Sequence, residues 1–303
     1  MELRHLETLL AIAEEGSFTA AADVLATVQS NVSEQIRQLE AELGTQLLVR
    51  GRRGAEATES GDVVLERARR IRREVEAMRT DLAMLQGLEV GESSFGIVGT
   101  ASRWVVPRLV AELRERAPGI RLRVNEAASE RLMSDVLAGE LAQAVVTEPV
   151  SDRRLVAETI LEEALVAVVP RGVQMPVPPV PLASLVALGL VAPPPENPLR
   201  YEVEAVAAQQ GIELRINVEV EGIRLVADLV AAGAGASVLP ETAVPADLDV
   251  QMFPIAGMPP RRLAIVNARD AQLSFADRAV RETVLAVVAE RLRPGGARSG
   301  QPR

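Results

Sequence analysis

The sequence contains no cysteine and a single histidine, His5. The missing thiols exclude disulfides, thiolate metal sites and cysteine nucleophiles, and one histidine is too few for a histidine-based zinc site. No stretch has the length of a membrane-spanning helix, and the N-terminus lacks a signal-peptide pattern. Aromatic residues make up only 2%, so the cores must consist of Leu, Val, Ile and Ala. We therefore expect a cytoplasmic protein with no metal, no cofactor and no membrane partner.

Lysine is also absent, so all 33 basic residues are arginines, against 42 acidic residues. The net charge of -9 disfavours indiscriminate coating of nucleic acid, but it describes the whole chain and not one face. Each guanidinium group is a planar fork that suits phosphate and guanine. A chain of 303 residues with 48% hydrophobic content is long enough for two or three domains with substantial cores.

Three helices are expected in the first 45 residues. The first carries one apolar stripe, formed by Leu3, Leu6, Leu9, Leu10 and Ala13. Gly16 ends this helix, and Ser17 is a favourable N-cap for a second helix over 19–25. After a turn, a third helix runs to about Leu43, with Val32, Ile36 and Leu39 on its buried stripe. Two helices joined by a tight turn are typical of a helix-turn-helix, although a generic three-helix bundle has the same spacing.

The outward face of the third helix favours DNA binding, because amide, hydroxyl and guanidinium groups read base edges in a major groove. A glycine-punctuated basic hairpin over 47–54 follows and is typical of a wing that tracks phosphates or enters the minor groove. The predicted DNA-binding residues are Ser17, Thr19, Gln29, Ser30, Asn31, Ser33, Glu34, Arg37, Arg50, Arg52 and Arg53.

The runs over 16–25, 28–33 and 36–44 together resemble the signature of the LysR family of bacterial regulators. The family usually has proline where this chain has Ser30, and commonly has arginine where it has Glu34. Leu48-Val49 replaces the phenylalanine that often precedes the wing arginine. A carboxylate at Glu34 can accept a hydrogen bond from cytosine but repels phosphate. The resemblance implies a sequence-specific transcriptional regulator, and these departures predict an operator preference unlike the family norm.

Residues 1–60, the expected winged helix-turn-helix domain, hold five arginines and ten acidic residues, a net charge of -5. DNA affinity must therefore come from the placement of individual arginines rather than from the average charge of the domain. Helix N-termini directed at phosphates would add to it.

A long helix is expected over 61–87, because this segment contains no proline and has a heptad series of apolar residues. The series, which we predict to mediate dimerisation, is Val64, Ala68, Ile71, Val75, Met78, Leu82 and Leu85. Packing of the helix on its own domain is the alternative. Charged flanks favour self-association, which would allow two DNA-binding modules to contact two half-sites.

From residue 92 onward short apolar runs alternate with helical patterns. Strands are expected over 95–100, 120–125 and 144–147, with helices over 104–116 and 130–138. The order β-α-β-α-β predicts a largely parallel sheet with helices on both faces. A second unit follows, with strands expected over 164–169, 188–192, 214–220 and 235–240, and helices over 199–210 and 222–232. A last strand over 262–267 and a last helix over 274–292 end the pattern.

Two tandem α/β units are typical of a sensor with a ligand cleft at the seam between them. The resemblance to the LysR family implies an effector-binding domain over 92–303 that is similar to periplasmic binding proteins. In that fold the chain crosses to a second lobe and returns. We therefore expect lobe I over about 92–162 and 266–293, lobe II over about 163–265, and a disordered tail over 294–303.

Polar side chains in the loops that follow the strands are the candidate ligand contacts. The predicted effector-binding residues are Thr100, Ser102, Arg103, Ser129, Thr147, Glu148, Glu196 and Asn197. Hydroxyls and backbone N–H groups at helix starts suit a carboxylate or another polar effector. Each hydroxyl could equally be an N-cap only. Arg103 and Arg200 are candidate anion partners, although surface ion pairing is the commoner role of such residues.

Two other classes remain open. An enzyme fused to a helix-turn-helix is disfavoured, because the glycine-rich run over 233–237 precedes a strand rather than a helix. A Gly-x-Ser-x-Gly elbow is missing, and one histidine is a poor basis for a catalytic triad, so no catalytic residue is predicted. A purely architectural DNA-binding protein would not respond to any small molecule, and Trp104 fluorescence would distinguish it. The partners expected are double-stranded DNA, a small-molecule effector, further copies in a homodimer or homotetramer, and RNA polymerase if the protein is an activator.

Overall fold

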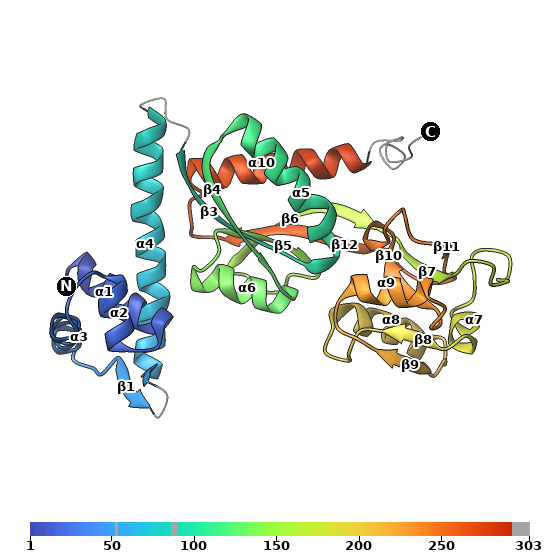
Figure 1. The fold of residues 1–303 in the computed structure, drawn as a ribbon, viewed down its shortest axis with the longest axis horizontal. Coiled ribbons are helices and arrows are strands. Elements are labelled where there is room, and N and C mark those ends of the chain that lie inside the picture. Colours follow the sequence, from blue (N-terminus) through green and yellow to red (C-terminus); the bar gives the residue numbers. More distant parts are fainter. Residues whose placement is uncertain (52–53, 86–89, 293–303) are drawn as a thin grey trace. The chain divides into compact units, whose positions relative to one another are not determined.

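The computed structural model describes residues 1–51, 54–85 and 90–292 (Figure 1). It divides into an N-terminal unit that extends to Gln86 and a C-terminal unit that follows. Arg52, Arg53 and the tail predicted over 294–303 lie outside the described residues. Within the described part of the chain, no helix is long and apolar enough to cross a membrane.

The N-terminal unit is a winged helix-turn-helix. Its elements are α1 (Leu3–Glu15), α2 (Phe18–Val24), α3 (Gln29–Leu43), β1 (Leu48–Gly51), β2 (Gly54–Ala57) and α4 (Glu59–Leu85). The predicted caps Gly16, Ser17 and Gly44 are confirmed, whereas the second helix, expected over 19–25, begins and ends one residue earlier. Gly16 ends α1 with a φ of 72°, and the Ser17 hydroxyl accepts a hydrogen bond from the backbone N–H of Ala20 at 3.1 Å. Gly44 ends α3 with a φ of 70°.

The core of this unit lies between the inner faces of its four helices. Leu9 and Ile12 of α1 pack with Ile36 and Leu39 of α3, and small alanines on α2 allow the close approach of the neighbouring helices. The first turns of α4 join the same core through Leu65. The long helix therefore begins as part of the DNA-binding domain rather than as a separate linker.

The C-terminal unit contains two lobes. The sheet of the first has the order β4-β3-β5-β12-β6. Its strands are β3 (Val90–Ile97), β4 (Gly119–Glu126), β5 (Gln143–Thr147), β6 (Leu155–Glu163) and β12 (Arg261–Ala268). Helices α5 (Gly99–Arg116) and α10 (Phe275–Leu292) cover one face, and α6 (Ser129–Ala138) covers the other (Figure 1). The helices thus lie on both faces of the sheet, as the sequence predicted.

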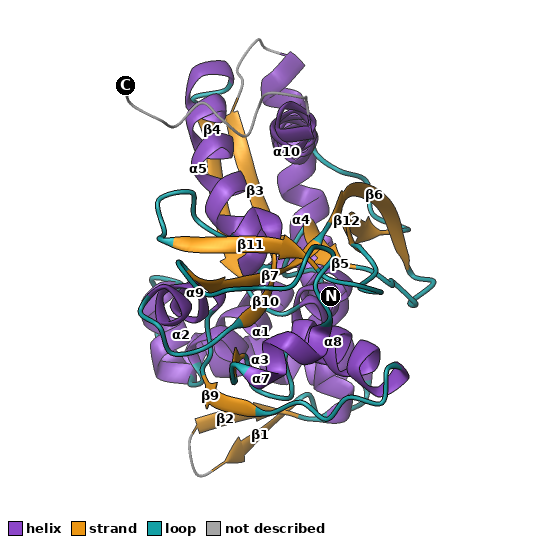
Figure 2. Ribbon diagram, turned by 90° about the vertical axis from the view of Figure 1, so that its right-hand side faces the viewer, coloured by secondary structure: helices purple, strands orange, loops and turns teal. Residues whose placement is uncertain are grey.

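The second lobe is built around β7 (Leu165–Pro170), which pairs with β10 (Ser237–Pro240) and β11 (Val250–Pro254) (Figure 2). A parallel pair, β8 (Leu190–Ala192) and β9 (Ile216–Glu219), joins it through a bridge from Leu190 to Ala236. The remaining elements are α7 (Leu182–Ala187), α8 (Pro198–Gln209), α9 (Ile223–Ala231) and the 3-10 helix η1 (Glu241–Ala243).

The sheets are less parallel than the sequence pattern predicted. β12 runs antiparallel to both β5 and β6, and β7 is antiparallel to both of its neighbours. The alternation of apolar runs does not encode strand direction, which is set by the path of the chain between strands. Four elements were not predicted, namely β6, β11, α7 and η1. β6 is an edge strand with four consecutive exposed positions, so it lacks the apolar run that marks a buried strand.

The first β-to-α connection also differs from the prediction. β3 ends at Ile97 and α5 begins at Gly99, five residues before the expected helix start. Val98 is the N-cap residue, and its apolar side chain makes no capping hydrogen bond, so the sequence contains no start signal here. As a result, Thr100, Ser102 and Arg103 lie in the first turns of α5 and not in a loop.

The chain leaves the first lobe at the end of β6 and returns at the start of β12. The whole of β12, from Arg261 to Ala268, belongs to the sheet of the first lobe. The boundary expected between residues 265 and 266 therefore falls inside this strand, because the apolar run does not mark where the crossing occurs.

Candidate functional site

The structure places the polar residues predicted on α3 along its solvent-facing side. Gln29, Ser30 and Asn31 are exposed in the first turn, and Ser33 is half-buried next to the buried Val32. Val28 is the N-cap residue; its side chain makes no capping hydrogen bond and is 65% exposed. The first N–H groups of α3 therefore lack a side-chain cap and can donate to a phosphate. Asn31 donates to the Thr27 hydroxyl at 3.0 Å.

Further along the same face, Glu34 lies in a hydrogen-bonded cluster with two neighbours. Arg37 donates through Nε to Oε2 at 2.9 Å and through Nη2 to Oε1 at 2.6 Å, and Gln38 donates to Oε1 at 2.8 Å. The bonds from Arg37 and then Gln38 hold the pKa of the Glu34 carboxyl below its ordinary value. The same pair raises the pKa of Arg37. Glu34 is therefore ionised at neutral pH.

The remaining predicted DNA contacts lie on α2 and in the wing. Ser17 is engaged as the N-cap of α2, while Thr19 is exposed. β1 and β2 form the antiparallel hairpin of the wing. Gly54 anchors it, because any Cβ there would lie 2.1 Å from the backbone oxygen of Gly16. The side chain of Arg50, like all of Arg52 and Arg53, lies outside the described residues.

The predicted dimerisation series on α4 changes character along the helix. Val64 and Ala68 pack against the core of the N-terminal unit. Ile71, Met78 and Leu82 are exposed apolar side chains, and Val75 is half-buried. The side chain of Leu85 lies outside the described residues. Within the described part of the series, the apolar side chains that remain exposed are therefore Ile71, Met78 and Leu82.

The C-terminal unit contains a cavity of about 780 Å³. It is lined by Val98, Gly99, Thr100, Arg103, Glu126, Ala127, Ala128, Ser129, Thr147, Asn197, Pro198, Leu199, Glu221, Gly222, Ile223, Arg224, Ala243 and Arg261. These residues include the first residues of four helices, α5 and α6 of the first lobe and α8 and α9 of the second. Helix N-termini carry partial positive charge and N–H groups without intrahelical partners, so the cavity has the character of an anion site.

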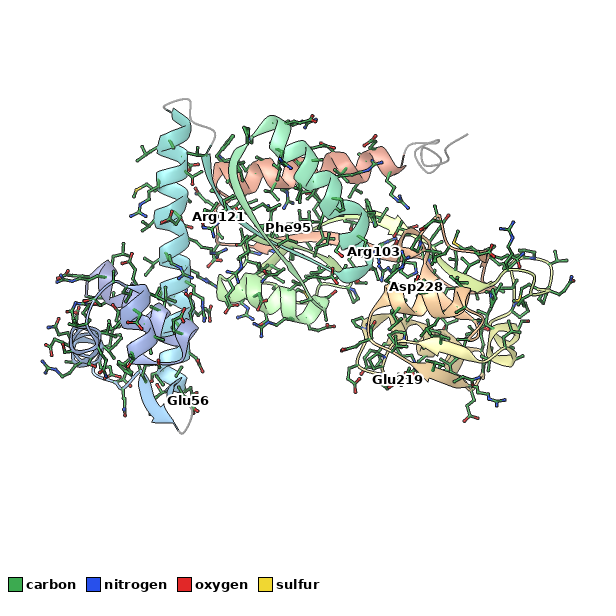
Figure 3. The ribbon with its side chains drawn as sticks, in the orientation of Figure 1. Glu56, Phe95, Arg103, Arg121, Glu219 and Asp228 are labelled. Carbon is green, nitrogen blue, oxygen red and sulfur yellow. The ribbon has the colours of Figure 1, made fainter. Side chains whose placement is uncertain are left out.

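Five of the eight predicted effector-binding residues line this cavity, namely Thr100, Arg103, Ser129, Thr147 and Asn197. Figure 3 labels Arg103 on the first turns of α5. Among the described residues, Arg103 has no ion-pair partner and is exposed, so its charge is available to a ligand. Asn197 also caps α8, since its Oδ1 accepts from the N–H of Leu199 at 3.0 Å.

The other three predicted residues do not line the cavity. The Ser102 hydroxyl lies within hydrogen-bond distance of the backbone oxygen of Gly99 and of the Glu126 carboxylate, so its single O–H donor is engaged within the protein. Glu148 follows Thr147 along an extended segment, so its side chain points to the opposite side from that of Thr147. There it accepts a hydrogen bond from the Thr159 hydroxyl. Glu196 lies in the loop before α8 and is not among the lining residues. Arg200, the other candidate anion partner, is instead paired with Glu204 at 2.7 Å.

Two hydroxyls of the cavity wall already accept a hydrogen bond within the protein. Thr100 Oγ1 accepts from Nη2 of Arg261, and Ser129 Oγ accepts from the N–H of Thr147 at 3.0 Å. Because a hydroxyl also has one donor, both O–H groups remain able to donate to a ligand oxygen. The two side chains are therefore suited to an acceptor such as a carboxylate.

Sequence reasoning missed four charged residues of the wall, Glu126, Glu221, Arg224 and Arg261. Glu126 ends β4 as Thr147 ends β5, so its position at the end of a strand was a sequence signal for a ligand contact. Arg224 follows the start of α9 and pairs with Asp228 at 2.8 Å. Arg261 was not predictable, because it reaches the cavity only through the return of the chain from the second lobe to the first.

A winged helix-turn-helix on a long helix, followed by a two-lobed domain with a polar cavity, defines a ligand-responsive DNA-binding regulator. A family described as "Bacterial regulatory helix-turn-helix protein, lysR family" matches residues 3–62, and one described as "LysR substrate binding domain" matches residues 86–289. The chain belongs to the LysR family. It is a DNA-binding transcriptional regulator with an effector-binding domain.

Curated relatives agree with this assignment. The nitrogen assimilation regulatory protein nac of Klebsiella aerogenes is 31% identical over 244 residues, 80% of this chain and 79% of the relative. The regulator BenM of Acinetobacter baylyi is 31% identical over 266 residues, 86% and 85% of the two chains. Both are named as regulators and not as enzymes.

Solved structures show the same architecture. Full-length CbnR complexed with its target DNA is 28% identical, covers 95% of this chain and all of its own, and has a TM-score of 0.54. A variant of full-length OxyR from Pseudomonas aeruginosa has a TM-score of 0.72 at 20% identity, with coverage of 95% and 97%. The latter likeness shows the fold alone.

Proposed function

We propose that an anionic metabolite binds in the cavity of the C-terminal unit and thereby changes how paired N-terminal units engage an operator. The observation that carries this proposal is the meeting of four helix N-termini with Arg103, which has no ion-pair partner among the described residues, at one cavity. The O–H donors of Thr100 and Ser129 add to the same preference. A carboxylate is the effector group that these features fit best.

The cavity wall includes residues from both lobes, so a bound effector would contact both. A ligand that contacts both lobes stabilises the arrangement in which those contacts form, and can shift an equilibrium only by its differential affinity for the two states. Coupling to DNA then requires that the operator also distinguishes these arrangements. Closure or twisting of the two-lobed domain is the first step of this mechanism.

DNA recognition is proposed for α3 in the major groove, with Gln29, Ser30, Asn31, Ser33, Glu34 and Arg37 as base or phosphate contacts, and for the wing with Arg50, Arg52 and Arg53. Self-association through the exposed apolar residues of α4 would present two such modules to two half-sites. Homodimers and homotetramers both satisfy this requirement, and contact with RNA polymerase is expected if the protein is an activator.

We also infer that the protein has no catalytic role and acts in the cytoplasm, where the chromosome lies. Several relatives are named as hydrogen peroxide-inducible genes activators. This chain contains no cysteine, so a thiol cannot be the group through which it responds to an oxidant. A reversibly bound small molecule remains the signal that its cavity fits.

Thermal melting of the full-length protein with a panel of carboxylate metabolites tests the cavity. A ligand at one hundred times its dissociation constant stabilises the folded state by about 2.7 kcal/mol, which is a measurable rise in Tm. Arg103→Ala should abolish the rise, whereas Arg121→Ala, which removes an exposed arginine of β4 outside the cavity, should preserve it. A rise that persists unchanged in Arg103→Ala and Ser129→Ala would place the effector elsewhere.

A further inference from the structure

Glu34, Arg37 and Gln38 form a hydrogen-bonded cluster on α3. The proposed placement of α3 in the major groove does not by itself explain why these side chains are paired. Glu34 is 44% exposed and Arg37 is 73% exposed, so both side chains remain accessible although they are paired. Arg37 contacts both oxygens of the carboxylate, which fixes the carboxylate and guanidinium groups side by side.

Counting hydrogen-bonding positions shows what the pair still offers. An ionised carboxylate only accepts, and each of its oxygens has about two positions. Oε1 accepts from both Arg37 and Gln38, whereas Oε2 accepts from Arg37 alone and retains one position. Arg37 uses two of its five N–H donors on Glu34, so three remain. The pair therefore presents an acceptor beside a set of donors.

A G·C base pair presents the complementary pattern in the major groove. Cytosine offers its N4 amino group as a donor, and guanine offers O6 and N7 as adjacent acceptors. Carboxylates accept from cytosine N4, and arginine donates to guanine O6 and N7, which no other base presents together. Arg37 also neutralises the carboxylate, which removes the repulsion that an unpaired Glu34 would have with nearby phosphates.

We propose that Glu34 and Arg37 read one G·C base pair in each half-site as a single unit, with Glu34 on the cytosine and Arg37 on the guanine. The inference rests on the proposed placement of α3 in the major groove and goes beyond it by assigning a base pair to two residues. The LysR resemblance places arginine commonly at position 34, so this unit distinguishes the operator of this chain from those of its relatives.

A structural role alone is the competing explanation. Exposed pairs three residues apart on a helix contribute only about 0.2–0.5 kcal/mol, and α4 has such a pair in Glu76 and Arg79. If the cluster only supports the helix, its removal changes stability slightly and leaves base preference unchanged. The two explanations therefore differ in the sequence that is bound, not in the affinity.

Selection from random-sequence DNA with the full-length protein separates them. The wild type should enrich a motif with a conserved G·C pair in each half-site. Glu34→Gln should weaken the selection of cytosine at this pair, because the carboxylate is the group that accepts from cytosine N4. Arg37→Met should reduce the guanine preference on the order of tenfold. Glu42→Gln is the matched control, because it removes one carboxylate from the exposed surface of the same helix and should leave the motif unchanged.

The proposal is overturned if Glu34→Gln and Arg37→Met enrich the wild-type motif, or if Arg37→Met only weakens binding equally for all sequences, as the loss of a phosphate contact would. Circular dichroism melting of both variants is the control that establishes whether they are folded. A wild-type protein that enriches no motif would contradict the placement of α3 itself, which is a different result from an unchanged motif.

Discussion

Arg261 Nε lies 2.6 Å from Glu163 Oε1, in an ion pair whose side chains are only 5% and 2% exposed. Glu163 is the last residue of β6 and Arg261 the first residue of β12, so the pair joins the two strands at which the chain crosses between lobes. Arg261 also donates to Thr100 at the start of α5, and Thr242 of η1 donates to Glu163. One buried network thus connects the cavity wall to both lobes.

Breaking this pair should destabilise the C-terminal unit strongly. Glu163→Gln removes the direct ion-pair partner of the buried Arg261, which costs about 3–5 kcal/mol, and urea unfolding measures the loss. The adjacent pair of Glu162 and Arg262 joins the same two strands but is exposed, so Glu162→Gln should cost less than about 1 kcal/mol. Equal losses in the two variants would show that the buried pair has no special role.

The pH dependence of stability should include a contribution from Glu202 on α8. Burial raises the pKa of this carboxyl above 4.5, the nearby Glu163 raises it further, and Arg261 partly opposes the shift. The folded protein therefore holds this proton to higher pH than the unfolded chain. The contribution to stability is complete below pH 4.5 and is lost as the pH rises through the folded-state pKa.

Glu202→Gln should consequently gain stability relative to the wild type at pH 7 and lose that advantage at pH 4, as measured by urea unfolding at both values. Glu115→Gln removes an exposed carboxylate of α5 and controls for the change in net charge. A Glu202→Gln variant that is less stable than the wild type at pH 7 would contradict the assigned direction.

Self-association should depend on the exposed apolar residues of α4. Met78→Glu and Leu82→Glu should each weaken the oligomer roughly tenfold or more, because burial of such a side chain contributes about 1.5–3 kcal/mol. Sedimentation equilibrium measures the change. Val177→Glu, which places the same charge on the most exposed valine of the second lobe, should leave the oligomer unchanged.

Mutations of α3 and of the wing should have different effects on DNA binding, the first on sequence preference and the second on overall affinity. Gln29→Ala or Ser33→Ala should alter the preferred sequence, because both are proposed base contacts of α3, where Gln29 is exposed and Ser33 is half-buried. Arg52→Ala should weaken binding to all sequences and reduce the slope of log K against log salt by about 1. Footprints at several salt concentrations distinguish these outcomes, and an unchanged preference in the first two variants would move the reading face elsewhere.

The winged domain was the most predictable part of the molecule, because its boundaries are marked by local signals such as Gly16, Ser17 and Gly44. The cavity was predicted only in part. Thr100, Ser129 and Asn197 lie at helix starts, where strand-to-helix connections indicate ligand contacts. Arg261 was not predicted, since its position depends on the path of the chain and not on the neighbouring sequence.

The heptad series shows a different limit of sequence reasoning. A regular apolar seam predicts that a helix packs against something, but not what it packs against. Val64 and Ala68 contact the core of their own domain, while Met78 and Leu82 remain exposed. The same periodicity thus describes an intramolecular contact at one end and an exposed surface at the other.

A nuclease footprint of the full-length protein on the DNA upstream of its own gene tests the central claim most directly. It is recorded with and without a small-molecule extract of the cells that contain the gene. We predict a protected segment with two half-sites whose pattern changes with the extract, and an Arg103→Ala protein that protects the same segment but does not respond. A protected segment that responds equally in Arg103→Ala, or the absence of any specific protection, would contradict the account.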